Sequence, residues 1–171
     1  MDAILFTSYT GHTAAYAKAL SQKLQIPAYP LKEAGRHLSR GASVIYLGWI
    51  MAGSIKGAAK AAKQYHVELL CGVGLADPGE AMLVSLCARH QMFCPDVFYL
   101  QGGYDGARLR GPYRFLMHMM CDSLAKKENR TPEESAMLES LTQGGDFVRA
   151  ENLNGILQFL EGKDNLQKNS K

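Results

Sequence analysis

A short run near the start of the chain, Ser8-Tyr9-Thr10-Gly11-His12-Thr13, combines hydroxyl side chains with one glycine. It lies between an apolar run and an alanine-rich segment, so it joins a predicted strand to a predicted helix. Such a loop offers backbone N–H groups, the positive end of a helix dipole and hydroxyl donors, which together can hold a phosphate. The run lacks the lysine of a Walker A loop, so it suits a phosphate monoester bound by neutral donors. An ordinary Ser/Thr turn with a helix cap is the alternative.

Two further residues have side chains suited to a planar ligand. Trp49 is the only tryptophan and directly follows the apolar run 43–48. Its indole can stack on a planar ring, or it can pack a loop onto the sheet. Met51 offers a thioether contact with an aromatic ring. His12, inside the hydroxyl run, either meets a phosphate or faces solvent.

A second group of candidates lies beyond residue 100 and consists of Tyr104, Arg108, Arg110 and Arg114. Arginine side chains bind carboxylates in a bidentate manner, so this group can contact a substrate, a partner protein or a membrane surface. A plain basic surface is the alternative. The methionine-rich run 115–120 is predicted to pack on the core, with an exposed end as a docking patch.

Other kinds of chemistry find little support in the sequence. No convincing catalytic triad is present, and the histidines have no metal-ligand spacing, so we predict neither catalytic side chains nor a metal site. The four cysteines form no CxxC pair and fit free thiols in a reducing, cytoplasmic setting. No signal peptide or membrane-spanning apolar run is apparent.

The composition is that of an ordinary globular domain. The chain has 171 residues, 47% hydrophobic content and a formal net charge of +3. The basic residues are spread out, which argues against nucleic-acid binding. We expect one domain over residues 1–162 and a polar, frayed tail over 163–171. The oligomeric state is left open.

The elements that must position these residues alternate between strands and helices. Apolar runs predict strands at 3–7, 28–31, 43–48, 67–75 and 97–100, and 49–57 is predicted to be a loop. Helices are predicted at 14–24, 58–65, 80–90, from Pro112 onward, after the cap Thr131, and at 152–160. This alternation is typical of a parallel sheet covered on both faces. The carboxyl edge of such a sheet is where ligands bind.

Three segments together resemble the flavodoxins. That family holds the phosphate of FMN with a T/S-x-T-G-x-T loop after its first strand, which the run from Ser8 to Thr13 matches. The resemblance implies a three-layer α/β/α sandwich on a five-stranded parallel sheet of order 2-1-3-4-5. It also implies that two loops flank the flavin ring. The residues assigned to them are Trp49, Ile50, Met51, Ala52 and Gly53 on one side, and Gly72, Val73, Gly74, Leu75 and Asp77 on the other.

The part of the chain after residue 100 is similar to the flavodoxin-like, menaquinone-dependent protoporphyrinogen dehydrogenases. That family carries a Gly-aromatic-Arg stretch and an Arg-Phe-Met helix near this position, but its long basic insertion is replaced here by the short, acidic segment 74–80. Three functions follow as alternatives. They are an FMN electron carrier that docks to a redox partner, an FMN oxidoreductase acting on a small or planar substrate, and a flavin-free binding module.

Overall fold

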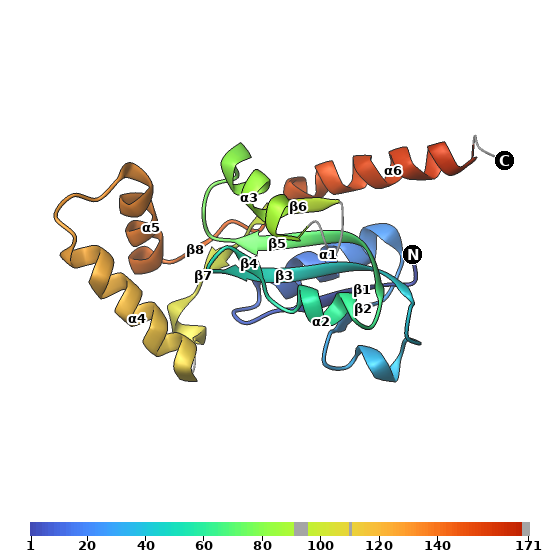
Figure 1. Ribbon diagram of the computed structural model, residues 1–171, viewed down its shortest axis with the longest axis horizontal. Helices are drawn as coiled ribbons and strands as arrows, with labels where there is room; N and C mark the ends of the chain where they lie inside the picture. Colours follow the sequence, from blue (N-terminus) through green and yellow to red (C-terminus); the bar gives the residue numbers. More distant parts are fainter. Residues whose placement is uncertain (91–95, 110, 169–171) are drawn as a thin grey trace.

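A mostly parallel sheet forms the centre of the computed structural model, which describes residues 1–90, 96–109 and 111–168. Its parallel strands follow the order β2-β1-β3-β5-β6 (Figure 1). Their bounds are β1 (Ala3–Thr7), β2 (Ala28–Pro30), β3 (Ser43–Met51), β5 (His66–Gly74) and β6 (Val97–Gln101). Most of these strands are rich in β-branched or aromatic residues and are buried on both faces, as in α/β proteins.

The sheet has six strands where the sequence predicted five. The added strand is β4 (Ser54–Ile55), which runs antiparallel to the end of β3. The predicted loop 49–57 was therefore wrong in part. Trp49 and Ile50 extend β3, and the chain turns back through Ala52 and Gly53, whose φ angles are 50° and 69°. Positive φ at both central residues is what a tight hairpin turn requires.

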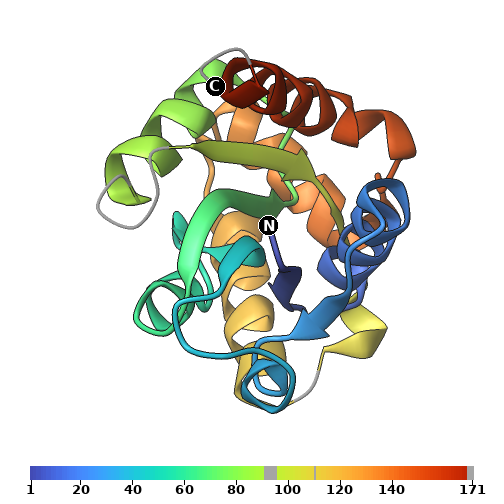
Figure 2. The same ribbon diagram turned by 90° about the vertical axis from the view of Figure 1, so that its right-hand side faces the viewer.

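Helices cover both faces of the sheet, as Figure 2 shows. The helices α1 (His12–Leu24) and α6 (Asn154–Lys168) pack on one face, and α2 (Ala58–Ala62) and α3 (Glu80–His90) on the other. Alternation along the strands explains the division. Along β3, for example, Ile45 faces α1 and α6, whereas Tyr46 faces α2 and α3.

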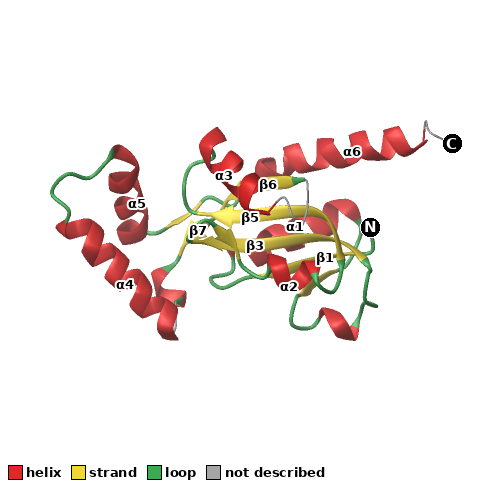
Figure 3. Cartoon of the chain, in the orientation of Figure 1, coloured by secondary structure: helices red, strands yellow, loops and turns green. Residues whose placement is uncertain are grey.

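A helical hairpin stands away from the sheet. It consists of α4 (Gly111–Lys126) and α5 (Pro132–Gln143) and is joined to the body by β7 (Gly103–Tyr104) and β8 (Gly145–Asp146) (Figures 1 and 3). The predicted capping box is confirmed, because Thr131 accepts from the backbone of Glu134, whose carboxylate accepts from the backbone of Thr131. The methionine-rich run does not pack on the core as predicted. Phe115 is 69% exposed and Met119 54% exposed.

Short 3₁₀ turns and the final helix complete the chain. The turns are η1 (Ala34–Arg36), η2 (Gly106–Arg108) and η3 (Ala150–Leu153). Helix α6 continues to Lys168, so much of the expected tail is helical. Cys71, Cys87 and Cys121 form no disulfide among the described residues, while Cys94 and the candidate Arg110 lie outside them. Among the described helices, none is long and apolar enough to span a bilayer.

Candidate functional site

The hydroxyl loop lies at the carboxyl edge of the sheet, between the end of β1 and the start of α1. Gly11 is the residue that precedes the helix, and its φ of 108° is one that glycine adopts readily. No side chain caps the helix, so the hydroxyl groups are not used as an N-cap. The Ser8 hydroxyl is buried and has no hydrogen-bond partner among the described residues. A buried, unsatisfied hydroxyl is costly, and a bound ligand would remove that cost.

The other polar residues of the loop are held locally. Thr10 Oγ1 hydrogen bonds to His12 Nδ1 over 3.0 Å. Thr13 is almost completely buried in the first turn of α1. His12 does not simply face solvent, because its other ring nitrogen lies 3.9 Å from Asp146 Oδ1. The loop thus brings Ser8, His12 and the N-terminus of α1 to one edge of the sheet.

Tyr46 on β3 fastens the start of this loop to the hairpin that follows. Its side chain is fully buried, and its hydroxyl lies 2.7 Å from both Thr7 Oγ1 and the Lys56 carbonyl oxygen. Burial raises the pKa of Tyr46 to about 12, against a smaller opposing effect of the Thr7 hydrogen bond. Gly57 passes close beside this hydroxyl, where a Cβ atom would meet it. These contacts therefore fix the end of β1 next to the segment that follows the β3–β4 hairpin.

An aromatic cluster lies beside the loop and contains Tyr9, Trp49 and Tyr113. The Trp49 ring centroid is 5.8 Å from Tyr9 and 5.3 Å from Tyr113, and Tyr9 and Tyr113 are 4.8 Å apart. The Lys56 ammonium lies 6.0 Å from the Trp49 ring. Tyr113 packs edge-to-face against both other rings, an arrangement that is favourable for aromatic side chains. Tyr113 comes from α4 and was not predicted to be a site residue.

The predicted ring-flanking residues after Trp49 are partly structural. Ile50 packs over Gly72, and a Cβ added to Gly72 would lie 2.9 Å from the Ile50 side chain. Met51 ends β3, and Ala52 and Gly53 form the tip of the hairpin. Ala52 at this tip is exposed, and Trp49, Met51 and Gly53 are partly exposed.

The second predicted flanking segment divides in the same way. Gly72 and Val73 are buried within β5. Gly74 and Leu75 lead out of the strand toward Asp77, which accepts a hydrogen bond from the Gln101 amide over 2.7 Å. Burial, together with the nearby Asp77 carboxylate, raises the pKa of Tyr99, whose hydroxyl bonds to the Ala76 carbonyl.

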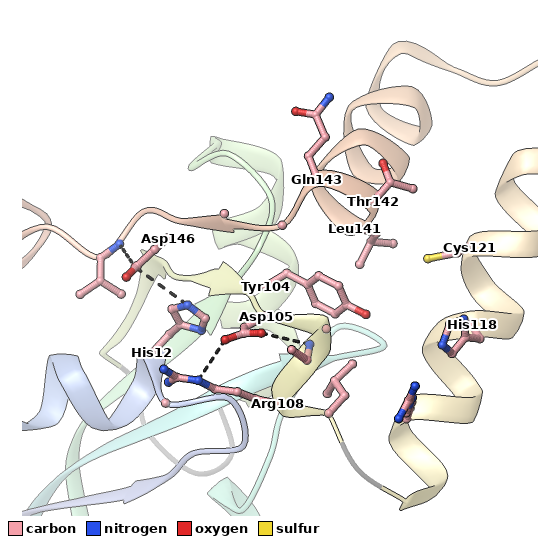
Figure 4. A pocket seen from close by; sticks show the side chains of 18 of the residues that line it. His12, Tyr104, Asp105, Arg108, His118, Cys121, Leu141, Thr142, Gln143 and Asp146 are labelled. Atoms are coloured by element: carbon pink, nitrogen blue, oxygen red, sulfur yellow. Dashed lines mark hydrogen bonds and ion pairs between the residues drawn. The ribbon is translucent and has the colours of Figure 1, made fainter.

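A cavity of about 1030 Å³ opens between the start of α1 and the α4–α5 hairpin. It brings together Gly11 and His12 of the loop with Tyr104, Arg108 and Arg114 of the second candidate group. Figure 4 shows Cys121 of α4 pointing across the cavity toward Tyr104. Several lining residues were not predicted from the sequence, namely Asp105, His118, Cys121 and Asp146. No sequence pattern relates Asp146 to the loop, because the two meet only through β7–β8 pairing.

The cavity is lined by both polar and apolar residues, and its charges are partly paired. Arg108 Nε lies 2.9 Å from Asp105 Oδ2. Burial and the neighbouring Asp122 carboxylate raise the pKa of the Cys121 thiol, which favours the unreactive protonated form. Burial and Cys121 likewise raise the pKa of Tyr104. Within residues 1–90, 96–109 and 111–168, no group of three or more metal-ligating side chains comes together.

Comparison of the chain with models of protein families, with characterised proteins and with solved structures gives no match.

Proposed function

We propose that this chain is a flavodoxin-like redox protein that binds FMN non-covalently at the edge of its sheet. The observation that carries the proposal is the Ser8 hydroxyl, which is buried without a partner in a loop that no side chain caps. A phosphate oxygen placed there would accept from Ser8 and from the first N–H groups of α1. The cost of the unsatisfied hydroxyl would then be removed.

The sheet order supports the same proposal. The parallel strands lie in the order β2-β1-β3-β5-β6, and β4 is only a short antiparallel addition at the end of β3. When β4 is left out and the five parallel strands are numbered along the chain, this order reads 2-1-3-4-5. The direction of strand addition reverses between β1 and β3. Ligands of open α/β sheets bind in the crevice at that reversal, outside the carboxyl ends of the strands. The loop from Ser8 to Thr13 begins at this position.

The residues of the chain would bind and orient the cofactor. The loop would hold the phosphate, and the exposed faces of Tyr9 and Trp49 would contact the ring. The hairpin tip at Ala52 and Gly53 and the segment leading to Asp77 would border the ring on its other sides. Bound FMN would supply one- or two-electron transfer, for which no side chain has to act as a nucleophile or general base.

The test is titration with FMN, followed through flavin absorption and quenching of Trp49 fluorescence. Ser8→Ala is expected to weaken FMN binding about 10- to 100-fold, since one hydrogen bond to a charged group is lost. Ser39→Ala, an exposed serine outside the site, is the matched control and is expected to bind as the unmodified chain does. If the chain does not bind added FMN, the proposal is refuted and the flavin-free binding module remains as the alternative.

The cavity favours a second candidate, an FMN oxidoreductase that acts on an anionic substrate. Arg114 and His118 line the cavity next to the proposed phosphate loop and form no ion pair within the part of the chain that the structure describes. The resemblance to the protoporphyrinogen dehydrogenases belongs to this candidate. The test is turnover of a carboxylate-bearing electron donor. A lower turnover rate in Arg114→Gln, with FMN binding retained, would favour the oxidoreductase over the electron carrier.

A further inference from the structure

Arg108 reaches the hydroxyl loop from a distant part of the chain. Its Nη1 atom donates to the Thr10 carbonyl oxygen over 3.1 Å. A Cβ atom on Gly11 would lie only 2.9 Å from the same nitrogen. Figure 4 shows Arg108 between Asp105 and the N-terminal end of α1. The glycine therefore permits both the turn into α1 and the close approach of a guanidinium group.

Local hydrogen bonds hold Arg108 in this position. Asp105 caps the short turn η2 by accepting from the Ala107 N–H over 3.0 Å, and its other oxygen pairs with Arg108 Nε. The preceding residues are tied to the sheet, because the Gly102 N–H donates to the Gly74 carbonyl over 2.7 Å. The guanidinium is thus oriented before any ligand arrives, which lowers the entropy lost on binding.

The guanidinium also has unused hydrogen-bonding capacity. An arginine side chain carries five N–H donors. Asp105 and the Thr10 carbonyl use two of these, and the rest have no partner among the described residues. The group lines the cavity that the start of α1 also lines. The run from Ser8 to Thr13 contains no lysine or arginine, and Arg108 brings to it a positive charge that the run itself lacks.

We propose that Arg108 completes the phosphate site by pairing its guanidinium with the FMN phosphate, so that the protein selects FMN over riboflavin. The inference rests on the proposed function and deepens it. The sequence predicted a phosphate held by neutral donors alone. Folding instead brings a positive charge to the loop from residues almost a hundred positions later.

The test measures the dissociation constants of FMN and of riboflavin for each protein, through flavin fluorescence. Arg108→Gln is expected to weaken FMN binding about 10- to 100-fold, the loss typical of a hydrogen bond to a charged group. Riboflavin binding is expected to stay unchanged. Arg108→Lys is expected to keep part of the preference, because lysine retains the charge but not the fork of donors. Arg40→Gln removes an exposed charge near the opposite edge of the sheet and serves as the control.

Ionic strength gives a second measurement. Salt screens exposed charge pairs, so the preference of the unmodified chain for FMN is expected to fall as salt is added. The preference of Arg108→Gln is expected to show little dependence on salt. Riboflavin binding in each variant also reports whether the site has folded.

The outcomes separate the two proposals. If the unmodified chain binds FMN and Arg108→Gln keeps the same preference over riboflavin, the role of Arg108 is refuted and flavin binding stands. If Arg108→Gln weakens the binding of FMN and of riboflavin equally, the role of the arginine is purely structural, which also refutes the inference. If the unmodified chain binds neither flavin, the proposed function fails and this inference fails with it.

Discussion

Replacing Tyr46 with phenylalanine tests how the start of the candidate loop is fastened. The ring is fully buried, and its hydroxyl lies 2.7 Å from both Thr7 Oγ1 and the Lys56 carbonyl oxygen. Tyr46→Phe keeps the ring but leaves these two partly buried oxygen atoms without their tyrosine partner. Loss of such a partner is expected to lower the free energy of unfolding by about 1–3 kcal/mol at neutral pH.

The same hydroxyl predicts how this difference changes with pH. Burial raises the pKa of Tyr46 from 10.0 to about 12. Because the folded-state pKa lies above the unfolded one, the stabilisation is complete below pH 10 and is lost as pH rises toward 12. Midway, near pH 11, the contribution of Tyr46 to the free energy of unfolding is expected to be smaller by about 1.4 kcal/mol. Phenylalanine does not titrate, so the two proteins should differ less there than at neutral pH.

The assay is urea denaturation of both proteins at neutral pH and near pH 11, followed by the fluorescence of Trp49. Other groups titrate equally in the two proteins, so their effects cancel in the difference. Tyr29→Phe is the control, because the half-buried Tyr29 hydroxyl makes no hydrogen bond among the described residues. A difference of the same size at both pH values, or no destabilisation at all, would refute the reasoning.

Three further predictions concern the loop and the helical hairpin. Gly11→Ala places a side chain at a φ of 108° and against Arg108. It is expected to lower the free energy of unfolding, measured by urea denaturation, by about 1–3 kcal/mol and to weaken FMN binding. Unchanged values would contradict the role given to this glycine. Thr131→Ala removes the cap of α5 and is expected to lower the stability of that helix by about 1 kcal/mol. The measurement is amide hydrogen exchange, which is expected to be faster in the first turn of α5. Equal exchange in the two proteins would show that the cap contributes nothing. Tyr113→Ala removes the ring between α4 and the sheet, so the emission of Trp49 is expected to shift to the red, and an unshifted spectrum would count against the aromatic cluster.

Local patterns in the sequence were sufficient for most of the sheet and its covering helices. The strands at the core are continuous apolar runs, and β1 and α3 have the predicted bounds. The capping box at Thr131 was also predicted, because its residues lie within one helical turn. Such features depend on neighbouring residues, which is why they can be recognised without a structure.

Where the predictions failed, the deciding contacts lie far apart in the chain. The extension of β3 past Gly48 depends on pairing with both β5 and β4, and the exposure of Phe115 depends on where the hairpin is attached. A local apolar pattern cannot distinguish a core helix from one that stands away from the sheet.

The candidate site shows the same division. The sequence by itself determined the hydroxyl loop, its glycine and its place between a strand and a helix. Only the tertiary structure decided that Ser8 is left without a partner, that Tyr113 joins Trp49, and that Arg108 reaches Thr10. These contacts arise because parallel strands bring their carboxyl ends to one edge, where segments remote in sequence converge.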